Sequence, residues 1–118
     1  MRIGIVGSRR WNRRETVEEL INMLPLNSTI VSGGCLGVDT WAKEAAESRG
    51  MDVVEYLPDL PPDGSPPWEF TKAYHSRNQQ IAENVDVLYA FVAEDRRGGT
   101  ENTINHAMKL NVRVEVIQ

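Results

Sequence analysis

The sequence contains few of the residues on which several classes of protein depend. It has one cysteine, Cys35, and two histidines among its 118 residues. A single cysteine cannot form an internal disulfide, which suits a reducing compartment and predicts a cytoplasmic protein. Three such side chains also disfavour a zinc site of the usual composition, so we expect neither a metal ion nor another cofactor.

Long hydrophobic runs and an excess of positive charge are also missing. No apolar segment approaches the roughly 20 residues that a membrane-spanning helix requires. The N-terminus enters a strand-like segment directly and lacks the pattern of a signal peptide. The formal net charge is −4, which is unlike the basic footprint of most nucleic-acid-binding domains. We therefore expect no membrane contact, and nucleic acid is a disfavoured partner.

Strand-like and helical segments alternate from one end of the chain to the other. Short β-branched segments span residues 2–6, 28–31, 52–56, 85–91 and 112–117. Apolar residues recur at helical spacing in the segments between them. The third of these segments is expected to bury Phe70, Ala73, Tyr74, Ile81 and Ala82, and the fourth Ile104, Ala107, Met108 and Leu110. Alternation over short connections predicts βαβ units. We predict one α/β domain over residues 1–118, a Rossmann-like three-layer sandwich with a five-stranded parallel sheet and helices on both faces.

Five of the six prolines lie between residues 57 and 67, directly after the third predicted strand. Proline fixes φ and removes a hydrogen-bond donor, so this segment is predicted to be a stiff irregular loop. Two interpretations remain open for it: a rigid connector, or a lid over a ligand site.

Three turns follow predicted strands, at the sheet edge where open parallel sheets bind ligands. They span residues 7–14, 32–40 and 94–101, and each leads into a predicted helix. Glycines let the backbone approach a phosphate, and a helix N-terminus presents free N–H groups to it. The candidate phosphate-binding residues of these turns are Gly7, Ser8, Arg9, Ser32, Gly33, Gly34, Gly37, Gly98, Gly99 and Thr100. The alternative is that the glycines only allow tight turns and the hydroxyls only cap helices.

Arginines are concentrated in the first and third of these turns. Six of the 13 basic residues lie there: Arg9, Arg10, Arg13, Arg14, Arg96 and Arg97. The guanidinium group matches phosphate with two parallel donors, so this clustering indicates an anionic ligand. Arg9 is nearest the end of its strand and is the best candidate, whereas Arg13 and Arg14 are expected on a solvated helix face.

Several other polar residues have two possible roles. Asp39, in the first turn of the second predicted helix, either complements the helix dipole or accepts hydrogen bonds from a ribose or an arginine. Arg77 and Asn78, on the third predicted helix, either lie at the surface or reach over the sheet edge. His75 and His106 are expected at the surface, and Cys35 is expected to be a small buried filler.

The usual nucleotide-binding and nucleophile signatures are absent, but the ordered motifs resemble the SLOG superfamily, which includes the DNA-processing-protein-A and LOG branches. The resemblance extends over most of the chain. Its motifs are Gly7-Ser8-Arg9 with Trp11, Ser32-Gly33-Gly34-x-x-Gly37-Val38-Asp39-Thr40, Arg77-Asn78, and Gly98-Gly99-Thr100 before a helix. Their order and spacing are most similar to those of the small single-domain YspA-type members.

This resemblance implies a Rossmann-like domain that binds a nucleotide-like small molecule at the glycine-rich turns and assembles into homo-oligomers. LOG-branch phosphoribohydrolases cleave the N-glycosidic bond of nucleoside monophosphates with an arginine, which Arg77 matches, and a glutamate in P-G-G-x-G-T-x-x-E. Here Thr103 stands at the position of that glutamate. Glu101 lies about 200° around the helix from it, at 100° per residue. The catalytic candidates are therefore Arg77 with either Glu101 or Asp39 as a substitute carboxylate.

Three functions compete on this evidence. The favoured one is a sensor or binding module for a nucleotide or nucleotide-derived phosphorylated ligand. The second is a phosphoribohydrolase acting on nucleoside monophosphates. The third is a single-stranded DNA binder, which the acidic net charge and the small number of aromatic residues disfavour.

Overall fold

The computed structural model describes residues 1–118 and contains five strands that alternate with four helices. In chain order the elements are β1 (Arg2–Gly7), α1 (Arg14–Met23), β2 (Thr29–Ser32), α2 (Val38–Ser48), β3 (Asp52–Glu55), α3 (Pro67–Glu83), β4 (Val87–Phe91), α4 (Gly99–Lys109) and β5 (Arg113–Ile117). Each predicted strand and helix is present, and the Rossmann-like α/β fold is confirmed.

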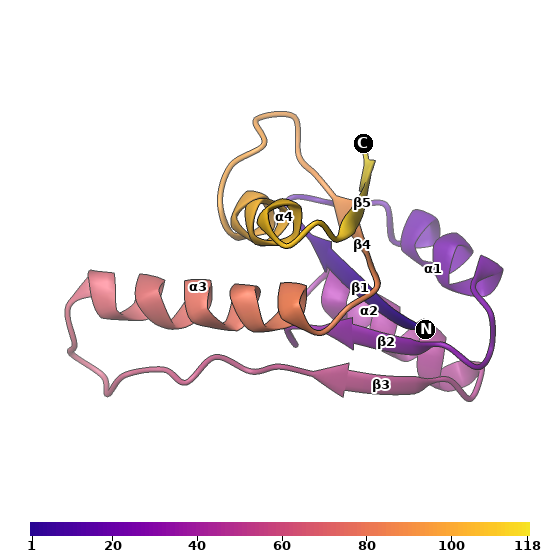
Figure 1. The fold of residues 1–118 in the computed structure, drawn as a ribbon, viewed down its shortest axis with the longest axis horizontal. Helices are drawn as coiled ribbons and strands as arrows, with labels where there is room; N and C mark the ends of the chain where they lie inside the picture. The colour runs from indigo at the N-terminus through magenta and orange to yellow at the C-terminus, as the bar shows by residue number, and fades with distance from the viewer.

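The five strands form one parallel sheet in the order β3-β2-β1-β4-β5. The chain moves outward from β1 to β3 and then crosses back to the other side of β1 for β4. The direction of winding therefore reverses between β1 and β4, which is where open α/β sheets form a crevice. The helices α1 and α2 cover one face of the sheet, and α3 and α4 cover the other (Figure 1).

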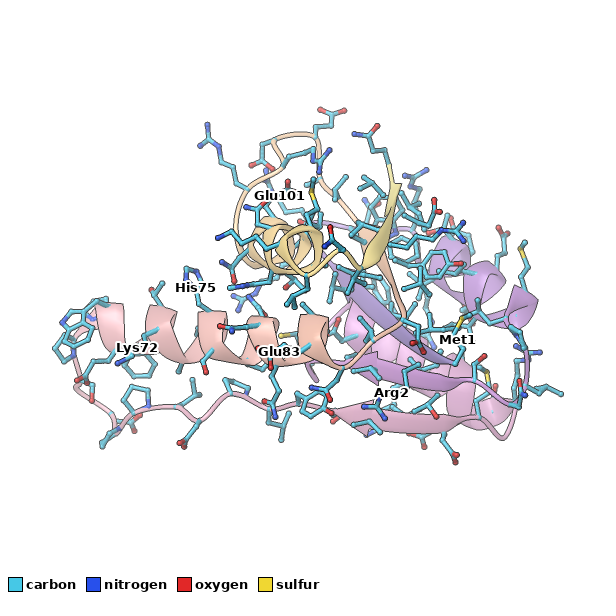
Figure 2. The ribbon with its side chains drawn as sticks, in the orientation of Figure 1. Met1, Arg2, Lys72, His75, Glu83 and Glu101 are labelled. Atoms are coloured by element: carbon cyan, nitrogen blue, oxygen red, sulfur yellow. The ribbon has the colours of Figure 1, made fainter.

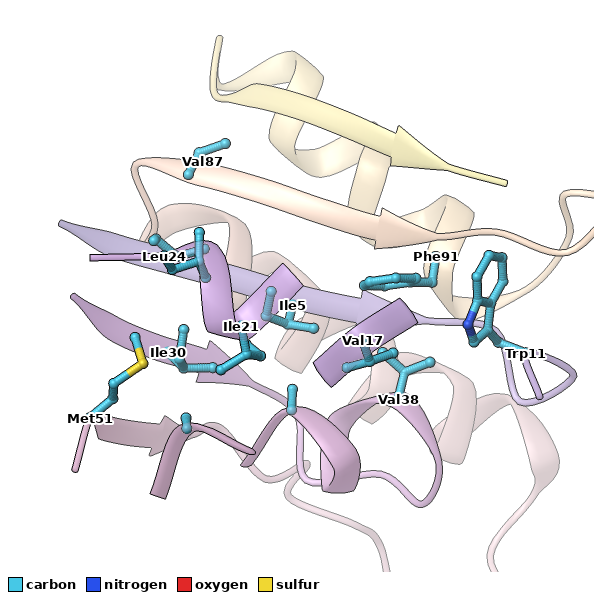
Figure 3. Packing of buried hydrophobic residues seen from close by; sticks show 13 residues of the cluster. Ile5, Trp11, Val17, Ile21, Leu24, Ile30, Val38, Met51, Val87 and Phe91 are labelled. Atoms are coloured by element: carbon cyan, nitrogen blue, oxygen red, sulfur yellow. The ribbon is translucent and has the colours of Figure 1, made fainter. Parts of the chain in front are cut away.

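Alternate strand residues supply two hydrophobic cores, one on each face of the sheet. On the face of α1 and α2, Ile5 packs in one cluster with Val17 and Ile21 (Figure 3). On the opposite face the neighbouring Val6 packs in a second cluster that includes residues of α3 and α4. Each fully buried side chain of this size contributes roughly 1.5–3 kcal/mol, so the two cores hold the sheet edge rigid.

The buried face of α4 differs from the prediction at Met108. Ile104 and Ala107 are buried as predicted, but Met108 is 63% exposed and Leu110, also expected to face inward, is 47% exposed. Thr100 and Thr103 are buried instead, and the Thr103 hydroxyl donates to the Gly99 carbonyl at 3.0 Å. The prediction was wrong because threonines that bond within their own helix fill the inward positions.

Helix α3 is longer than the sheet that it covers. Its buried residues, Arg77, Asn78, Ile81 and Ala82, all lie in its second half. Its first half projects past the carboxyl ends of the strands, and the proline-rich segment runs alongside it (Figure 1). Tyr74, expected in the core, is only partly buried because it lies on this projecting part. Even α3, with 17 residues, lacks the length and hydrophobicity needed to cross a membrane, as do the other helices.

Candidate functional site

A cavity of about 510 Å³ lies at the carboxyl edge of the sheet, where the winding reverses between β1 and β4. Its volume falls within the roughly 300–1,000 Å³ of small-molecule sites. Four segments line it: the turns after β1, β2 and β4, and the middle of α3. The predicted site residues among its lining are Gly7, Ser8, Arg9, Gly33, Asp39, Arg77, Asn78, Gly98, Gly99 and Thr100. No residue of the proline-rich segment lines it, so that segment is a connector beside α3.

Four predicted site residues lie outside the cavity lining. Ser32 is fully buried, and Gly34 and Gly37 have φ angles of 72° and 89°, which explains glycine at these turn positions. Glu101 lies on the side of α4 away from α3 and pairs with Arg96 at 3.1 Å (Figure 2). The helical rotation places Thr103 in the lining instead, so Glu101 does not supply a carboxylate to the cavity.

The turn after β1 is fixed to the end of β4 by hydrogen bonds through Ser8. The Ser8 amide donates to the Phe91 carbonyl at 2.9 Å, and the Ser8 carbonyl accepts from the Trp11 amide at 3.0 Å. The Trp11 ring packs edge-on against Phe91, with ring centroids 5.2 Å apart. This anchoring holds the intervening residues, Arg9 and Arg10, at the wall of the cavity.

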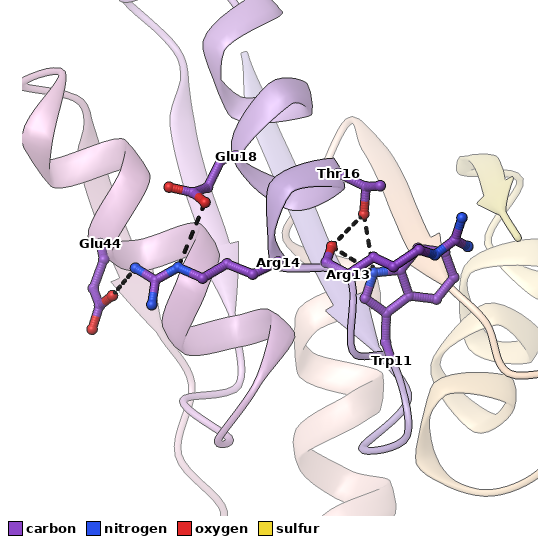
Figure 4. A network of polar contacts seen from close by, with 6 residues as sticks. All are labelled: Trp11, Arg13, Arg14, Thr16, Glu18 and Glu44. Carbon is purple, nitrogen blue, oxygen red and sulfur yellow. Dashed lines mark hydrogen bonds and ion pairs between the residues drawn. The ribbon is translucent and has the colours of Figure 1, made fainter.

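Two of the six clustered arginines stabilise the start of α1 and lie outside the cavity. Arg14 forms ion pairs with Glu44 at 2.7 Å and with Glu18 at 3.6 Å (Figure 4). The Arg13 guanidinium lies 4.3 Å from the centroid of the Trp11 ring. Both side chains are exposed, as expected of a solvated helix face.

Of the other four clustered arginines, two form ion pairs and two do not. The pairs are Arg10 with Asp95 and Arg96 with Glu101. Arg9 and Arg97 have no ion pair, side-chain hydrogen bond or aromatic contact, and both line the cavity. The cavity is therefore bordered by two guanidinium groups without a partner.

The turn after β2 is closed by its own side chains. The Asp39 carboxylate accepts hydrogen bonds from the amides of Gly33 and Cys35, both at 3.1 Å. From the other side, Arg77 donates to the Gly33 carbonyl at 2.6 Å and to Asn78 Oδ1 at 3.0 Å. Asp39 and Arg77 therefore occupy two amides and one carbonyl of this turn, and the start of α2 beyond it has no side-chain cap.

Burial sets the protonation behaviour of Asp39. Removal of its carboxyl from water raises the pKa to about 6, even though the Cys35 and Gly33 amides and the nearby Arg77 charge favour the ionised form. Gly33 is required by the same packing, because a Cβ at this position would lie 2.5 Å from Arg77 Nη1. Cys35 is half-buried in the cavity wall, with its sulfur 3.6 Å from Arg77 Nη2, and is not the buried filler that was predicted.

The start of α4 has backbone N–H groups without a side-chain partner, unlike the Gly33 and Cys35 amides of the turn after β2. Gly98 precedes the helix with φ 91°, and no side chain caps the first N–H groups. Gly99 and Thr100 line the cavity, so the positive end of the helix dipole lies at its wall. Asn78 ties this end to α3, because its Nδ2 donates to Asn102 Oδ1 at 3.1 Å. Uncapped amides and two free arginines thus border the same space.

Helix α3 lines the cavity with more residues than the predicted Arg77 and Asn78. Thr71, Tyr74 and His75 also line the cavity. They precede Asn78 by seven, four and three residues, which places them on one helix face, a signal that could have identified them. His75 is exposed as predicted, whereas His106 is half-buried between α3 and α4, where desolvation lowers its pKa. The structure contains no group of three or more His, Cys, Asp or Glu side chains placed to hold a metal ion.

Comparison with solved structures finds the same fold in other proteins. DNA processing protein A from Streptococcus pneumoniae superposes with a TM-score of 0.80 at 25% identity, over 99% of this chain and 50% of that one. The protein TM1055 gives 0.75 at 23% identity, over 96% of this chain and 71% of that one. The C-terminal domain of the PF1911 hydrogenase from Pyrococcus furiosus superposes with a TM-score of 0.54 at 11% identity, over 99% of this chain and 91% of that one. The last two likenesses show the fold alone.

The chain thus spans half the length of the DNA processing protein A chain that it matches. No curated protein matches the sequence. A sequence model of the family described as "YspA, cpYpsA-related SLOG family" matches residues 1–61 of the 118, slightly more than half of the chain. That match contains β1 to β3 and the first two turns at the sheet edge. The resemblance inferred from the motifs is confirmed, and the chain belongs to the YspA, cpYpsA-related SLOG family.

Proposed function

We propose that the cavity binds a nucleotide or nucleotide-derived phosphorylated ligand, and that the protein acts as a sensor or binding module for it. The observation that carries this proposal is the pair of unpartnered arginines, Arg9 and Arg97, beside the uncapped start of α4. The protein has more acidic than basic residues, yet these two arginines have no acidic side-chain partner, which suits them to bind an anionic ligand. Membership of a SLOG family supports a nucleotide-related role.

The proposal assigns the phosphate to the start of α4 rather than to the turn after β2. Neither α2 nor α4 has a side-chain cap, but Gly99 and Thr100 at the start of α4 line the cavity, whereas Val38 at the start of α2 does not. In the turn before α2, the Asp39 carboxylate already accepts from the amides of Gly33 and Cys35. The phosphate would accept from Gly99 and Thr100 and pair with the two free arginines. The sugar or a second phosphate would lie towards Arg77 and Asn78, which line the cavity from α3.

The test is calorimetric titration of nucleoside mono- and diphosphates into the protein and two variants of Gly99. A Cβ at this position meets only Asn78 Nδ2, at 3.7 Å, so Gly99→Ala is expected to keep the wild-type affinity. Gly99→Asp places a negative charge at the phosphate and is expected to weaken binding at least about tenfold, or 1.4 kcal/mol. Its carboxylate also favours the helix N-terminus, so stability is retained.

A second pair of variants tests the arginines. Arg9→Ala is expected to weaken nucleotide binding about tenfold, a loss of the size of one charge-assisted contact. Arg113→Ala removes the same charge from β5, outside the cavity, and is expected to leave affinity unchanged. Unchanged binding in both Arg9→Ala and Gly99→Asp would show that the phosphate lies elsewhere.

One observation favours a second candidate, hydrolysis of the N-glycosidic bond of a nucleoside monophosphate. Asp39 is the one carboxylate among the residues that line the cavity, and Arg77 lines it as well. A carboxylate beside the sugar could stabilise a positively charged ribosyl transition state. Chromatography of free base after incubation with nucleoside monophosphates tests this activity, with Asp39→Asn as the control. Binding without base release would leave the sensor as the function.

A further inference from the structure

We infer that the α3 wall of the cavity is a nucleobase subsite in which Tyr74 provides the stacking surface. This inference rests on the proposed function and narrows it, because it requires a base-bearing nucleotide rather than a bare sugar phosphate or inorganic phosphate. It assigns to Tyr74, Thr71 and His75 the recognition of an uncharged aromatic ring system.

The position of these residues separates them from the anion-attracting end of the cavity. Arg9 and Arg97 come from the turns after β1 and β4, at the edge of the sheet. Thr71, Tyr74 and His75 come from the half of α3 that projects past that edge, and Figure 2 shows His75 on the side of α3 nearer to α4. A ligand that contacts both groups must have a charged end and an uncharged end.

The chemistry of the α3 wall suits a base. Tyr74 and His75 carry the only aromatic rings in the lining, and the Tyr74 ring is half-buried. The Tyr74 hydroxyl forms no hydrogen bond in the structure, and the Thr71 hydroxyl donates only to the Pro67 carbonyl, at 3.3 Å. An aromatic face with nearby neutral polar groups favours stacking of a flat heterocycle and hydrogen bonds to its edge.

The Tyr74 ring lies within cation–π range of the Arg77 guanidinium, which is 5.9 Å from the centroid of the ring. That guanidinium is itself fixed by its bonds to the Gly33 carbonyl and Asn78, and the Arg77 side chain is buried. A stacking surface that is ordered before the ligand arrives loses little side-chain entropy on binding.

The experiment compares binding of nucleoside monophosphates and of ribose 5-phosphate to the wild-type protein and Tyr74 variants by calorimetry. Tyr74→Ala is expected to weaken nucleotide binding about tenfold or more, as loss of a base-stacking ring does, and to leave ribose 5-phosphate within about twofold. Tyr74→Phe keeps the ring but loses the hydroxyl, so its nucleotide affinity is expected to lie between those of the wild type and Tyr74→Ala. Tyr74→Leu keeps the packing against Arg77 but loses the flat face, so it is expected to behave as Tyr74→Ala does.

Trp68→Ala is the matched control on the same helix. Trp68 is 62% exposed and lines a separate groove beside the proline-rich segment, so its removal is expected to leave both affinities unchanged. The inference is overturned if the Tyr74 variants weaken nucleotide and ribose 5-phosphate equally, or neither. It is also overturned if ribose 5-phosphate binds the wild-type protein as tightly as nucleotides do, although the phosphate site would then stand. Failure of every phosphorylated ligand to bind would overturn both proposals.

Discussion

Two glycine-rich turns at the same sheet edge have the same sequence character and opposite states in the structure. In the turn after β2, Asp39 accepts from the amides of Gly33 and Cys35 and Arg77 donates to the Gly33 carbonyl, so these three backbone groups are already bonded. In the turn after β4, no side chain caps the start of α4, and Arg97 has no partner. Glycine content alone therefore does not distinguish a turn whose backbone groups are bonded to side chains from one that lies open beside a free arginine.

Because their bonding differs, we expect the two turns to have different roles, one in stability and the other in ligand affinity. The closed turn contributes rigidity, because a buried carboxylate and a buried guanidinium hold it from either side. The open turn contributes charge and free amides, which are useful only when an anion is present. Changes in the closed turn should therefore alter the stability of the fold, and changes in the open turn should alter affinity.

The largest effect on stability is expected from Arg77→Ala. The variant leaves the Gly33 carbonyl without its donor and Asp39 without the nearby positive charge, both in a buried setting. Loss of one partner from such a cluster costs about 3–4 kcal/mol of the free energy of unfolding. Urea denaturation followed by circular dichroism measures this loss, with the exposed Arg113→Ala as a neutral control. A loss below about 1 kcal/mol would mean that Arg77 does not hold the turn.

The closed turn also predicts a dependence of stability on pH. The native pKa of Asp39, about 6, lies above the ordinary value of 3.8, so the native state binds more protons between these values. The free energy of unfolding should therefore fall by about 3 kcal/mol as the pH rises from about 4 to 6, and then level off. Asp39→Asn should lack this contribution. The difference between the two proteins, measured by urea denaturation across pH 4–8, isolates it; a constant difference would contradict the prediction.

A matched pair of glycine substitutions sharpens the comparison directly. Gly33→Ala places a Cβ against the fixed Arg77 guanidinium and is expected to destabilise the protein by about 2 kcal/mol. Gly99→Ala meets only ordinary contact at 3.7 Å, and alanine favours the helix, so stability should rise by about 0.5 kcal/mol. Thermal or urea unfolding of both variants measures the two changes in stability. Equal losses at the two sites would remove the distinction between a closed and an open turn.

The smallest effect on stability is expected from Arg97→Ala in the open turn. The exposed side chain forms no ion pair and no side-chain hydrogen bond, so the free energy of unfolding should change by less than about 0.5 kcal/mol. Its affinity for nucleotides should nevertheless fall, as measured by calorimetry. A destabilised protein with unchanged affinity would reverse the roles assigned to the two turns.

Much of the architecture could be predicted because it depends on local pattern. Short β-branched segments and helical spacing identified all five strands and four helices, and the parallel order brought the turns after β1, β2 and β4 to one edge. The rotation of 100° per residue also placed Glu101 away from the position of Thr103. Met108 was wrongly expected in the core, because threonine is not recognised as a core residue by hydrophobic spacing.

The candidate site was less predictable because its composition depends on partners that are distant in the chain. The sequence left open whether Asp39 would face a helix dipole, a sugar or an arginine. The structure shows that its carboxylate accepts hydrogen bonds from two backbone amides. Tyr74 was expected in the core because it follows the helical spacing of apolar residues in α3. That spacing cannot show that this part of the helix extends past the sheet. The relative lengths of a helix and a sheet are settled only when both are packed together.

The sequence by itself determined the alternation of strands and helices, the sheet edge at which the turns gather and the family to which the motifs belong. Those properties follow from residue spacing along a short stretch of chain. The tertiary structure alone decided which turn is closed, which arginines are left without partners and which side chains of α3 reach the cavity. These depend on contacts such as Arg77 with Gly33, 44 positions apart, whose formation no local pattern encodes.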